Sequence, residues 1–441
     1  MRVNHSMRAE KPQLIRGIGI IGGALLVLNG MVGAGIFALP SVIAERAGVL
    51  SPWLFLGAGL LIIMIVLTLA ELSSYFTESG GPALYTTRAF GPLAGFSTGW
   101  LYYVSRASAI AANSHVMAKY LGALWPWFDT GTGHAVVIVV VCGTLTLVNV
   151  IGVKGGVRTL AFFTFFKMIP LLFLILLGLQ YVSPGALFPD NLPTVDDLGG
   201  TTLLLIYAFV GFESVLITAG ETEKPRATIP SALVRTVIAT GIFYFLISLV
   251  YVAVLPGDVN DGTLVDIGRQ LAGPTGAIVI TLTAVFSIGG NLSSTMLAVP
   301  RLTLSLAENR LLPQWFGRIH SRYSSPANSI IFLGGLATLL ALSGSFVRLA
   351  IASSLTRLIT YAVCIAALPV IKKRADSAAR QHAFNLKGGY TIPIIALGLC
   401  VWMASHSSAE SWKFVAALLA AGLLLFWIEH LSIRRAGRLG S

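Results

Sequence analysis

The chain alternates long apolar stretches with short polar segments. Each apolar stretch holds about 20 residues, which is enough for a helix to cross a hydrocarbon core of ~30 Å. Twelve such stretches are expected, over residues 17–46, 51–76, 91–124, 134–151, 158–182, 200–219, 231–255, 274–308, 325–345, 347–371, 389–406 and 411–432. The pattern predicts an all-α integral membrane protein with twelve transmembrane helices.

Two of these stretches are interrupted, and they open the two halves of the chain. The interruptions are Gly33-Ala34-Gly35 in the first stretch and Val210-Gly211-Phe212, followed at once by Glu213, in the sixth. A break in a spanning helix frees backbone N–H and C=O groups that lipid cannot satisfy, so the broken segment must line a cavity walled by protein. Paired breaks in corresponding positions point to the binding site of a transporter.

The first five stretches and the next five form two units, each of which opens with a broken helix. Because a unit with an odd number of spans ends on the opposite side of the membrane, the second unit must be inverted relative to the first. We expect one transmembrane domain, 17–432, made of repeat one (about 17–182), repeat two (about 200–371) and two extra helices (about 389–432). The flanking segments 1–16 and 433–441 are expected to be cytoplasmic.

The composition supports the membrane assignment and explains the charge. Hydrophobic residues make up 55% of the chain and charged residues 11%, against about 25% charged residues in soluble domains. The net charge is +12, but 22 of the 30 Lys and Arg residues fall on one side if the N-terminus is cytoplasmic. This is the positive-inside pattern, and it places both termini on the cytoplasmic side of the membrane. The membrane is expected to be a cell membrane of the bacterial inner-membrane type. Nucleic-acid binding is therefore not expected.

Several kinds of chemistry have no candidate residues in this sequence. The three cysteines lie on different spans, and the seven histidines do not cluster, so we expect no metal and no disulfide framework. Phosphate-loop and dinucleotide fingerprints are absent, so no nucleotide cofactor is expected. A membrane-embedded enzyme is the alternative of another class, and it would need a nucleophile–base or metal constellation. Lipid surrounds the chain, and no obligate protein partner is visible.

Short motifs along nearly the whole chain resemble the signatures of the amino acid–polyamine–organocation (APC) superfamily. They include Gly33-Ala34-Gly35-Ile36-Phe37, Ala70-Glu71-Leu72, Gly80-Gly81-Pro82, Phe209-Val210-Gly211-Phe212-Glu213 and Ala307-Glu308-Asn309-Arg310-Leu311-Leu312-Pro313. The resemblance implies a five-plus-five inverted repeat, called LeuT-like, with the first and sixth helices broken. It also implies transport of amino acids or amines by alternating access.

One pole of the expected site binds a carboxylate. The second half of the first helix starts near Gly35, so its leading N–H groups and the positive end of its dipole form an anion site. Val32, Gly33, Ala34 and Gly35 are the candidate residues there. The alternative is that the glycines serve only the close packing of helices.

The other pole binds an ammonium group. The first half of the sixth helix ends near Tyr207, and the carbonyls at a helix C-terminus attract a cation. The resemblance implies that the carbonyls of Tyr207, Ala208 and Val210, beside Gly211, receive the substrate ammonium. Tyr207 is either an aromatic gate that folds over the substrate or an ordinary aromatic anchor.

Three buried ionisable residues are candidates for coupling or bracing. Lys167 lies at the centre of the fifth span, where the resemblance implies an ammonium in place of the Na⁺ of sodium-coupled relatives. It either carries protons or is a permanent charge that braces the helices. Glu213 either locks the broken helix through backbone N–H groups or takes part in proton coupling. Glu71 is expected to have a structural or helix-bridging role, with a place in the substrate pocket as the alternative.

Two arginines within spans need acceptors, because a guanidinium does not lose its proton. Arg106 and Arg357 either face the cavity and prefer a carboxylate-bearing side chain, or pair with Glu71, Glu213 or backbone carbonyls. By resemblance, the remaining pocket candidates are Ser105 on the third span and Asn291 and Ser294 on the eighth. No free acid is visible among these residues, which disfavours a dedicated polyamine carrier.

Taken together, the sequence predicts a secondary transporter of small or medium neutral L-amino acids. It is expected to be independent of sodium and coupled to protons, with exchange of neutral amino acids as the alternative mechanism.

Overall fold

The computed structural model describes residues 17–152, 157–187, 195–255 and 262–439, so the expected N-terminal segment 1–16 lies outside the described residues. Within these ranges the regular structure is helical, apart from one isolated bridge between Ile18 and Thr222. The α-helices are α1 (Ile20–Met31), α2 (Gly35–Ala47), α3 (Ser51–Ser73), α4 (Gly81–Phe90), α5 (Pro92–Gly122), α6 (Gly131–Ile151), α7 (Val157–Gly178), α8 (Pro184–Leu187), α9 (Val195–Phe209), α10 (Ser214–Ile217), α11 (Pro225–Val254), α12 (Leu264–Glu308), α13 (Ala327–Ser343), α14 (Phe346–Arg374), α15 (Ser377–His382), α16 (Thr391–Ser405) and α17 (Ala409–Leu439).

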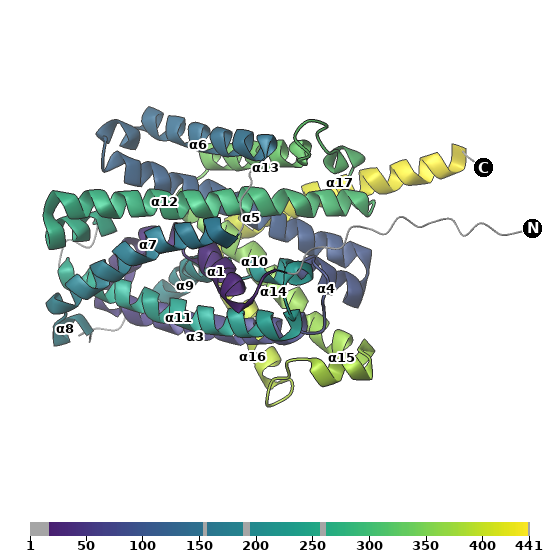
Figure 1. Ribbon diagram of the computed structural model, residues 1–441, viewed down its shortest axis with the longest axis horizontal. Helices are drawn as coiled ribbons and strands as arrows, with labels where there is room; N and C mark the ends of the chain where they lie inside the picture. Colours follow the sequence, from purple (N-terminus) through teal and green to yellow (C-terminus); the bar gives the residue numbers. More distant parts are fainter. Residues whose placement is uncertain (1–16, 153–156, 188–194, 256–261, 440–441) are drawn as a thin grey trace, which may run out of the picture.

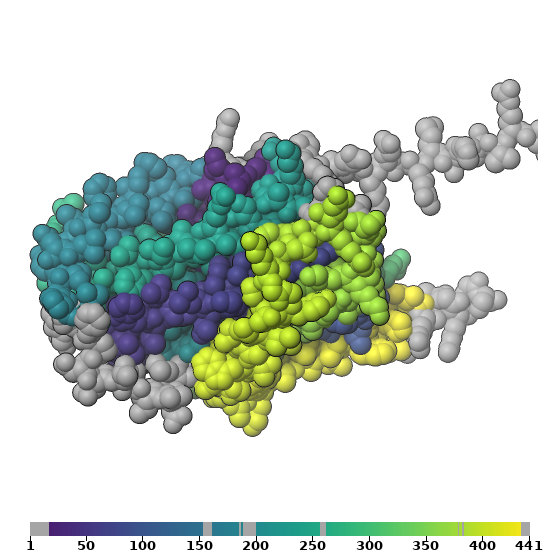
Figure 2. All heavy atoms as spheres, turned by 90° about the horizontal axis from the view of Figure 1, so that it is seen from below, coloured from purple at the N-terminus to yellow at the C-terminus, as the bar shows by residue number. Residues whose placement is uncertain are grey.

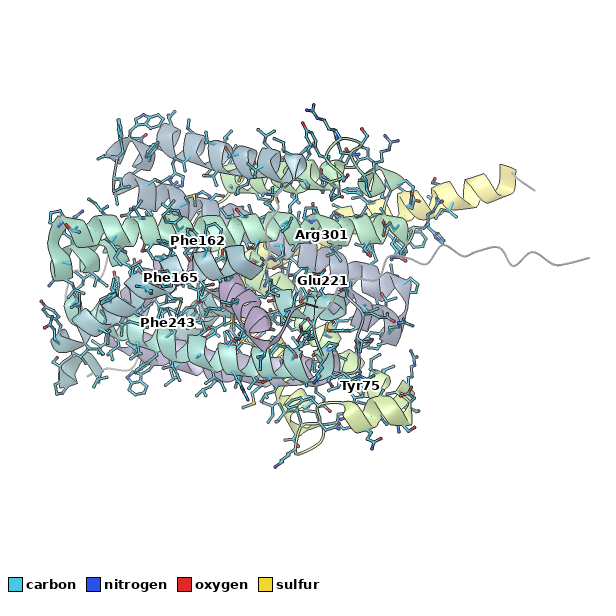
Figure 3. All side chains as sticks on the ribbon, in the orientation of Figure 1. Tyr75, Phe162, Phe165, Glu221, Phe243 and Arg301 are labelled. Atoms are coloured by element: carbon cyan, nitrogen blue, oxygen red, sulfur yellow. The ribbon has the colours of Figure 1, made fainter. Side chains whose placement is uncertain are left out.

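The long helices are suited to a bilayer. Among the described residues, seven segments are long and apolar enough to cross a membrane, and four shorter helices are also apolar. The outer faces carry large apolar side chains, such as Phe162 and Phe165 on α7, which are 53% and 60% exposed (Figure 3). A soluble protein rarely leaves so much contiguous apolar surface in water. The chain is therefore an all-helical, multi-pass membrane protein.

The first predicted break separates α1 from α2. Residues 32–34 are not helical, and side chains from neighbouring helices hold the carbonyls just before and inside the break. Tyr244 of α11 donates to the Met31 carbonyl at 3.0 Å, and Lys167 of α7 donates to the Val32 carbonyl at 2.8 Å. The carbonyls that lose their helical partners are thus satisfied inside the protein, as lipid cannot satisfy them.

The second break separates α9 from α10, and the chain beyond it differs from the expected continuous helix. Only the four residues Ser214–Ile217 are α-helical, and a 3₁₀ turn, Ala219–Glu221, follows. The backbone bonds from Leu216 to Glu213 and from Thr218 to Val215 span three residues, which is the tighter 3₁₀ spacing. Gly211 has φ +114°, a conformation that glycine adopts readily because it has no Cβ.

The two breaks touch each other at the centre of the molecule. A Cβ on Gly30 would collide with the Gly211 carbonyl, and a Cβ on Gly211 would collide with the Gly30 carbonyl. The two segments also pair at the other end of α1, where the N–H groups of Gly17 and Ile18 donate to the Glu221 carbonyl at 3.1 and 3.0 Å. Figure 1 shows α1 and α10 in the middle of the bundle, surrounded by longer helices.

The last two helices lie on the outside of the bundle. α16 packs against α3 and α14, and α17 packs against α5 and α14 (Figure 2). Trp100 of α5 donates its indole N–H to the Leu418 carbonyl of α17 at 2.8 Å.

Candidate functional site

A small polar cavity lies between the two breaks. It is bounded by both broken helices together with α5 and α12, and its lining residues are Gly30, Met31, Gly33, Ala34, Gly35, Arg106, Ala109, Asn113, Tyr207, Val210 and Asn291. Its volume is about 20 Å³, which is close to the room that one water molecule needs. A molecule larger than water therefore does not fit here unless the surrounding helices move apart.

Six of the predicted substrate-binding residues line this cavity, and three more adjoin it. The six are Gly33, Ala34, Gly35, Tyr207, Val210 and Asn291. Val32 turns its carbonyl toward Lys167, Gly211 abuts Gly30, and a Cβ on Gly35 would lie 3.0 Å from the Cα of Ala208. Ala34 and Gly35 begin α2, where the leading N–H groups have no acceptor within their own helix.

Ser105 and Ser294 are not among the lining residues. Ser105 faces α14, where its hydroxyl donates to the Ser353 carbonyl at 2.9 Å and accepts from Arg357 Nε at 2.7 Å. Consecutive residues of an α-helix point about 100° apart, so Ser105 turns away when its neighbour Arg106 faces the cavity. Neither serine lines this small cavity, so the pocket role expected for Ser105 and Ser294 stays a prediction.

Asn113 is a lining residue that the sequence interpretation missed. Together with Arg106 and Ala109 it has the spacing i, i+3, i+7, which places all three on one face of α5. That spacing of an amide from a buried arginine was the available signal.

A chain of amide hydrogen bonds joins four helices across the cavity. Tyr207 of α9 donates its hydroxyl to Asn113 Oδ1, and Asn113 Nδ2 donates to Asn291 Oδ1 of α12 at 3.1 Å. Asn291 Nδ2 donates in turn to the carbonyls of Asn29 and Gly30, both at 3.0 Å. The last turn of α1 is thereby tied to α12, and the Tyr207 ring is held against α5.

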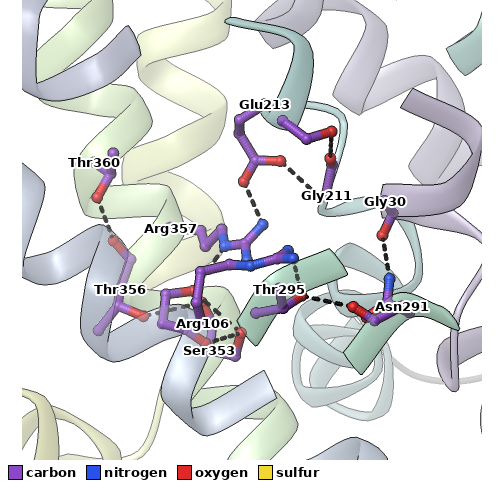
Figure 4. A network of polar contacts seen from close by, with 12 residues as sticks. Gly30, Arg106, Gly211, Glu213, Asn291, Thr295, Ser353, Thr356, Arg357 and Thr360 are labelled. Atoms are coloured by element: carbon purple, nitrogen blue, oxygen red, sulfur yellow. Dashed lines mark hydrogen bonds and ion pairs between the residues drawn. The ribbon is translucent and has the colours of Figure 1, made fainter. Parts of the chain in front are cut away.

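Arg106 faces the cavity. Its side chain is 7% exposed, and Nη2 donates to Thr295 Oγ1 on α12. Thr295 donates to the Asn291 carbonyl at 2.9 Å, so the arginine joins the amide chain through α12 (Figure 4). Arg106 forms no ion pair with Glu71 or Glu213, because each of these carboxylates has another cation.

Glu213 and Arg357 form a fully buried ion pair (Figure 4). The second oxygen of Glu213 accepts the Gly211 N–H at 2.6 Å, which holds the backbone of the break. Arg357 also stacks over the ring of Tyr102, with 5.5 Å from Cζ to the ring centroid. Arg357 thus has a carboxylate partner, and the bond to the Gly211 N–H is the contact that the locking alternative for Glu213 predicts.

Glu71 pairs with Lys372, which the sequence interpretation did not consider. The Nζ–Oε1 distance is 2.5 Å, and the bond joins α3 to α14. Lys372 lies near the end of α14 and is 301 residues from Glu71 in the sequence. No local sequence pattern therefore indicates that Lys372 is the partner of Glu71. The expected helix-bridging role of Glu71 has its physical basis in this bond.

Lys167 lies beneath the first break and is fully buried. Its ammonium and the hydroxyl of Ser287 both donate to the Val32 carbonyl, at 2.8 and 3.1 Å. No carboxylate pairs with Lys167 in the described part of the chain. Within the same described ranges, no group of three or more His, Cys, Asp and Glu side chains is placed to hold a metal ion.

Comparison with known proteins agrees with these features. A family model described as "Amino acid permease" matches residues 18–426. The chain is 25% identical to the methylthioribose transporter of Bacillus subtilis, over 96% of this chain and 95% of that protein. It is 26% identical to the serine/threonine exchanger SteT of Bacillus subtilis, over 89% of this chain and 91% of that protein. It is 27% identical to an uncharacterized transporter of Mycobacterium bovis, over 96% of this chain and 93% of that protein. The APC-type family expected from the motifs is confirmed.

Proposed function

The chain belongs to the amino acid permease family, and from that premise we propose that it is a secondary transporter of small or medium L-amino acids. One observation carries the proposal: the two helix breaks meet around a small polar cavity that only a water-sized molecule fits. The start of α2 offers N–H groups to a carboxylate, and the end of α9 offers carbonyls to an ammonium. A zwitterion matches these two poles.

The proposed architecture is a five-plus-five inverted repeat of the LeuT-like type, with twelve spans and both termini in the cytoplasm of the cell membrane. Its support is that a helix occupies each of the twelve expected ranges and that the first helix of each set of five is broken. Alternating access would open the cavity by moving the broken helices and their partners against α5 and α12. The amide chain from Tyr207 to Gly30 would have to part on one side, which makes Tyr207 the proposed gate.

The proposed preference is for amino acids with small or medium side chains. The lining offers Met31, Ala109 and Val210 as apolar surface, and it contains no carboxylate to receive a cationic side chain. The sequence predicted neutral amino acids on similar grounds.

Sodium independence is the proposed consequence of Lys167. Its ammonium satisfies the Val32 carbonyl at the end of the broken helix, where a bound cation would otherwise be needed. Replacing NaCl by choline chloride at constant ionic strength is therefore expected to leave the initial uptake rate unchanged within about twofold. A steep, saturable dependence of uptake on Na⁺ would contradict this role for Lys167.

Proton coupling is proposed through Lys167, with exchange as the alternative. The carboxylates Glu71 and Glu213 are each held in an ion pair, whereas Lys167 has no acid partner among the described residues and donates to a neutral backbone carbonyl. Exchange is favoured by one relative, which is named as a serine/threonine exchanger.

Uptake of labelled amino acids into proteoliposomes tests the whole proposal. A proton symporter accumulates label when the outside is acidified and the lumen is empty of substrate. An exchanger accumulates label only when the lumen is preloaded with unlabelled amino acid. Failure to carry any of the twenty amino acids under either condition would contradict transport of amino acids altogether.

A further inference from the structure

The buried charges around the cavity do not balance. Arg106, Arg357 and Lys167 are cationic, whereas Glu213 is the acid among them. Glu213 already pairs with Arg357 and accepts the Gly211 N–H, so its two oxygens are occupied. Arg106 is thus left without a carboxylate in the described ranges.

Arg106 also has donor capacity to spare. A guanidinium carries five N–H donors, and Nη2 uses one of them on Thr295. Nε is buried and has no acceptor among the described residues, although the side chain is only 7% exposed and lines the cavity. A buried cation with no carboxylate partner and with an N–H left unpaired is unfavourable, and Arg106 cannot shed its charge.

A substrate side chain that carries oxygen atoms would supply the acceptor that Arg106 lacks. On the proposed function, the α-carboxylate and α-ammonium already have partners at the starts and ends of the broken helices. Arg106 lies elsewhere in the lining, beside Thr295, which is one turn along α12 from Asn291. Arg106 therefore provides a third binding point, which would contact the side chain of the substrate. Planar carboxylates match the fork of a guanidinium with two parallel hydrogen bonds.

We propose that Arg106 is a specificity-determining residue that makes acidic amino acids better substrates than their neutral amides. The proposal rests on the proposed function and departs from the neutral side chains that the sequence predicted. The carboxylate of the substrate completes the charge balance of the closed cavity, which an amide of the same shape does not. A guanidinium that faces the cavity without a carboxylate likewise repels lysine and arginine side chains.

Pairs of substrates that differ only in charge give the test. Counterflow of labelled aspartate against asparagine, and of glutamate against glutamine, is measured in proteoliposomes of the full chain. We expect the acid of each pair to have a kcat/KM at least about tenfold higher, in line with charge-assisted hydrogen bonds. In Arg106→Gln the ratio should fall toward one through loss of acid transport, while amide transport persists. Arg106→Lys keeps the charge and should retain part of the preference.

The control is Arg269→Gln, since Arg269 lies on the exposed surface and, within the described residues, pairs with Asp266 at 3.5 Å. It should leave both the rate and the acid-to-amide ratio unchanged. Should Arg106→Gln fail to fold, the thermal shift of the wild-type protein still decides, because a preferred ligand raises Tm by mass action. Aspartate or glutamate should then raise Tm more than the corresponding amide.

The outcomes distinguish failure of the role proposed for Arg106 from failure of the proposed transport function. Transport of neutral amino acids with no advantage for the acids would overturn the role of Arg106 and leave the transporter in place. Equal loss of acid and amide transport in Arg106→Gln would overturn it as well, since Arg106 would then act on the α-carboxylate or on structure. Absence of any amino acid transport by the wild-type protein would refute the proposed function itself.

Discussion

Gly211→Ala is expected to abolish transport while the protein still inserts into the membrane. The backbone at Gly211 has φ +114°, which an L side chain rarely adopts, and the new Cβ would collide with the Gly30 carbonyl. An alanine where φ is positive destabilises a protein by more than ~1 kcal/mol, and the collision adds to this. Because the two breaks meet at this contact, forcing them apart disorders both poles of the site. Initial uptake rates, normalised to protein in the membrane, provide the measurement.

Gly30→Ala separates the close contact from the backbone conformation. Gly30 lies within α1, with no positive φ, yet its Cβ would collide with the same Gly211 carbonyl. It should therefore lose transport as Gly211→Ala does. The matched control is Gly57→Ala on α3, where a Cβ would meet no atom within 4 Å, and its transport and Tm should stay at wild-type values. Normal uptake by Gly30→Ala would show that the breaks need not touch.

Glu213→Ala is expected to be the most destabilising change to a single charge. It leaves Arg357 fully buried without its carboxylate and also removes the acceptor of the Gly211 N–H. Loss of one partner of a buried ion pair costs about 3–5 kcal/mol. The purified variant should therefore melt well below the wild type, and the loosened break should lower transport at temperatures where it stays folded.

A double-mutant cycle isolates the pair itself. Glu213→Gln with Arg357→Met removes both charges, so the double variant should be more stable than the sum of the two single losses implies. The control is Glu410→Ala: Glu410 pairs with Arg348 at 3.6 Å, and their side chains are 76% and 71% exposed. An exposed pair contributes about 0–1 kcal/mol. Equal stability losses from Glu410→Ala and Glu213→Ala would contradict a buried pair that locks the break.

Features that depend on local chemistry were predictable from the sequence alone. The breaks at Gly33 and Gly211 could be predicted because glycines that interrupt an apolar stretch form a local pattern in the sequence. Lys167, Glu213, Arg106 and Arg357 stood out for a similar reason, since an ionisable residue within a membrane span must have a partner or a role. The helix ranges followed from hydrophobic length, although the short 3₁₀ segment after α10 did not.

The partners of these residues were decided only by the tertiary structure. Glu213 and Arg357 are 144 residues apart, and Glu71 and Lys372 are 301 residues apart. Such pairs form where helices distant in the chain cross, and no spacing along one helix encodes that crossing. The same reason explains why Ser105 turned out to face α14, and why Asn113 was missed. Hydrophobic length and local breaks thus follow from the order of residues, whereas the pairing of buried charges follows from how the helices pack.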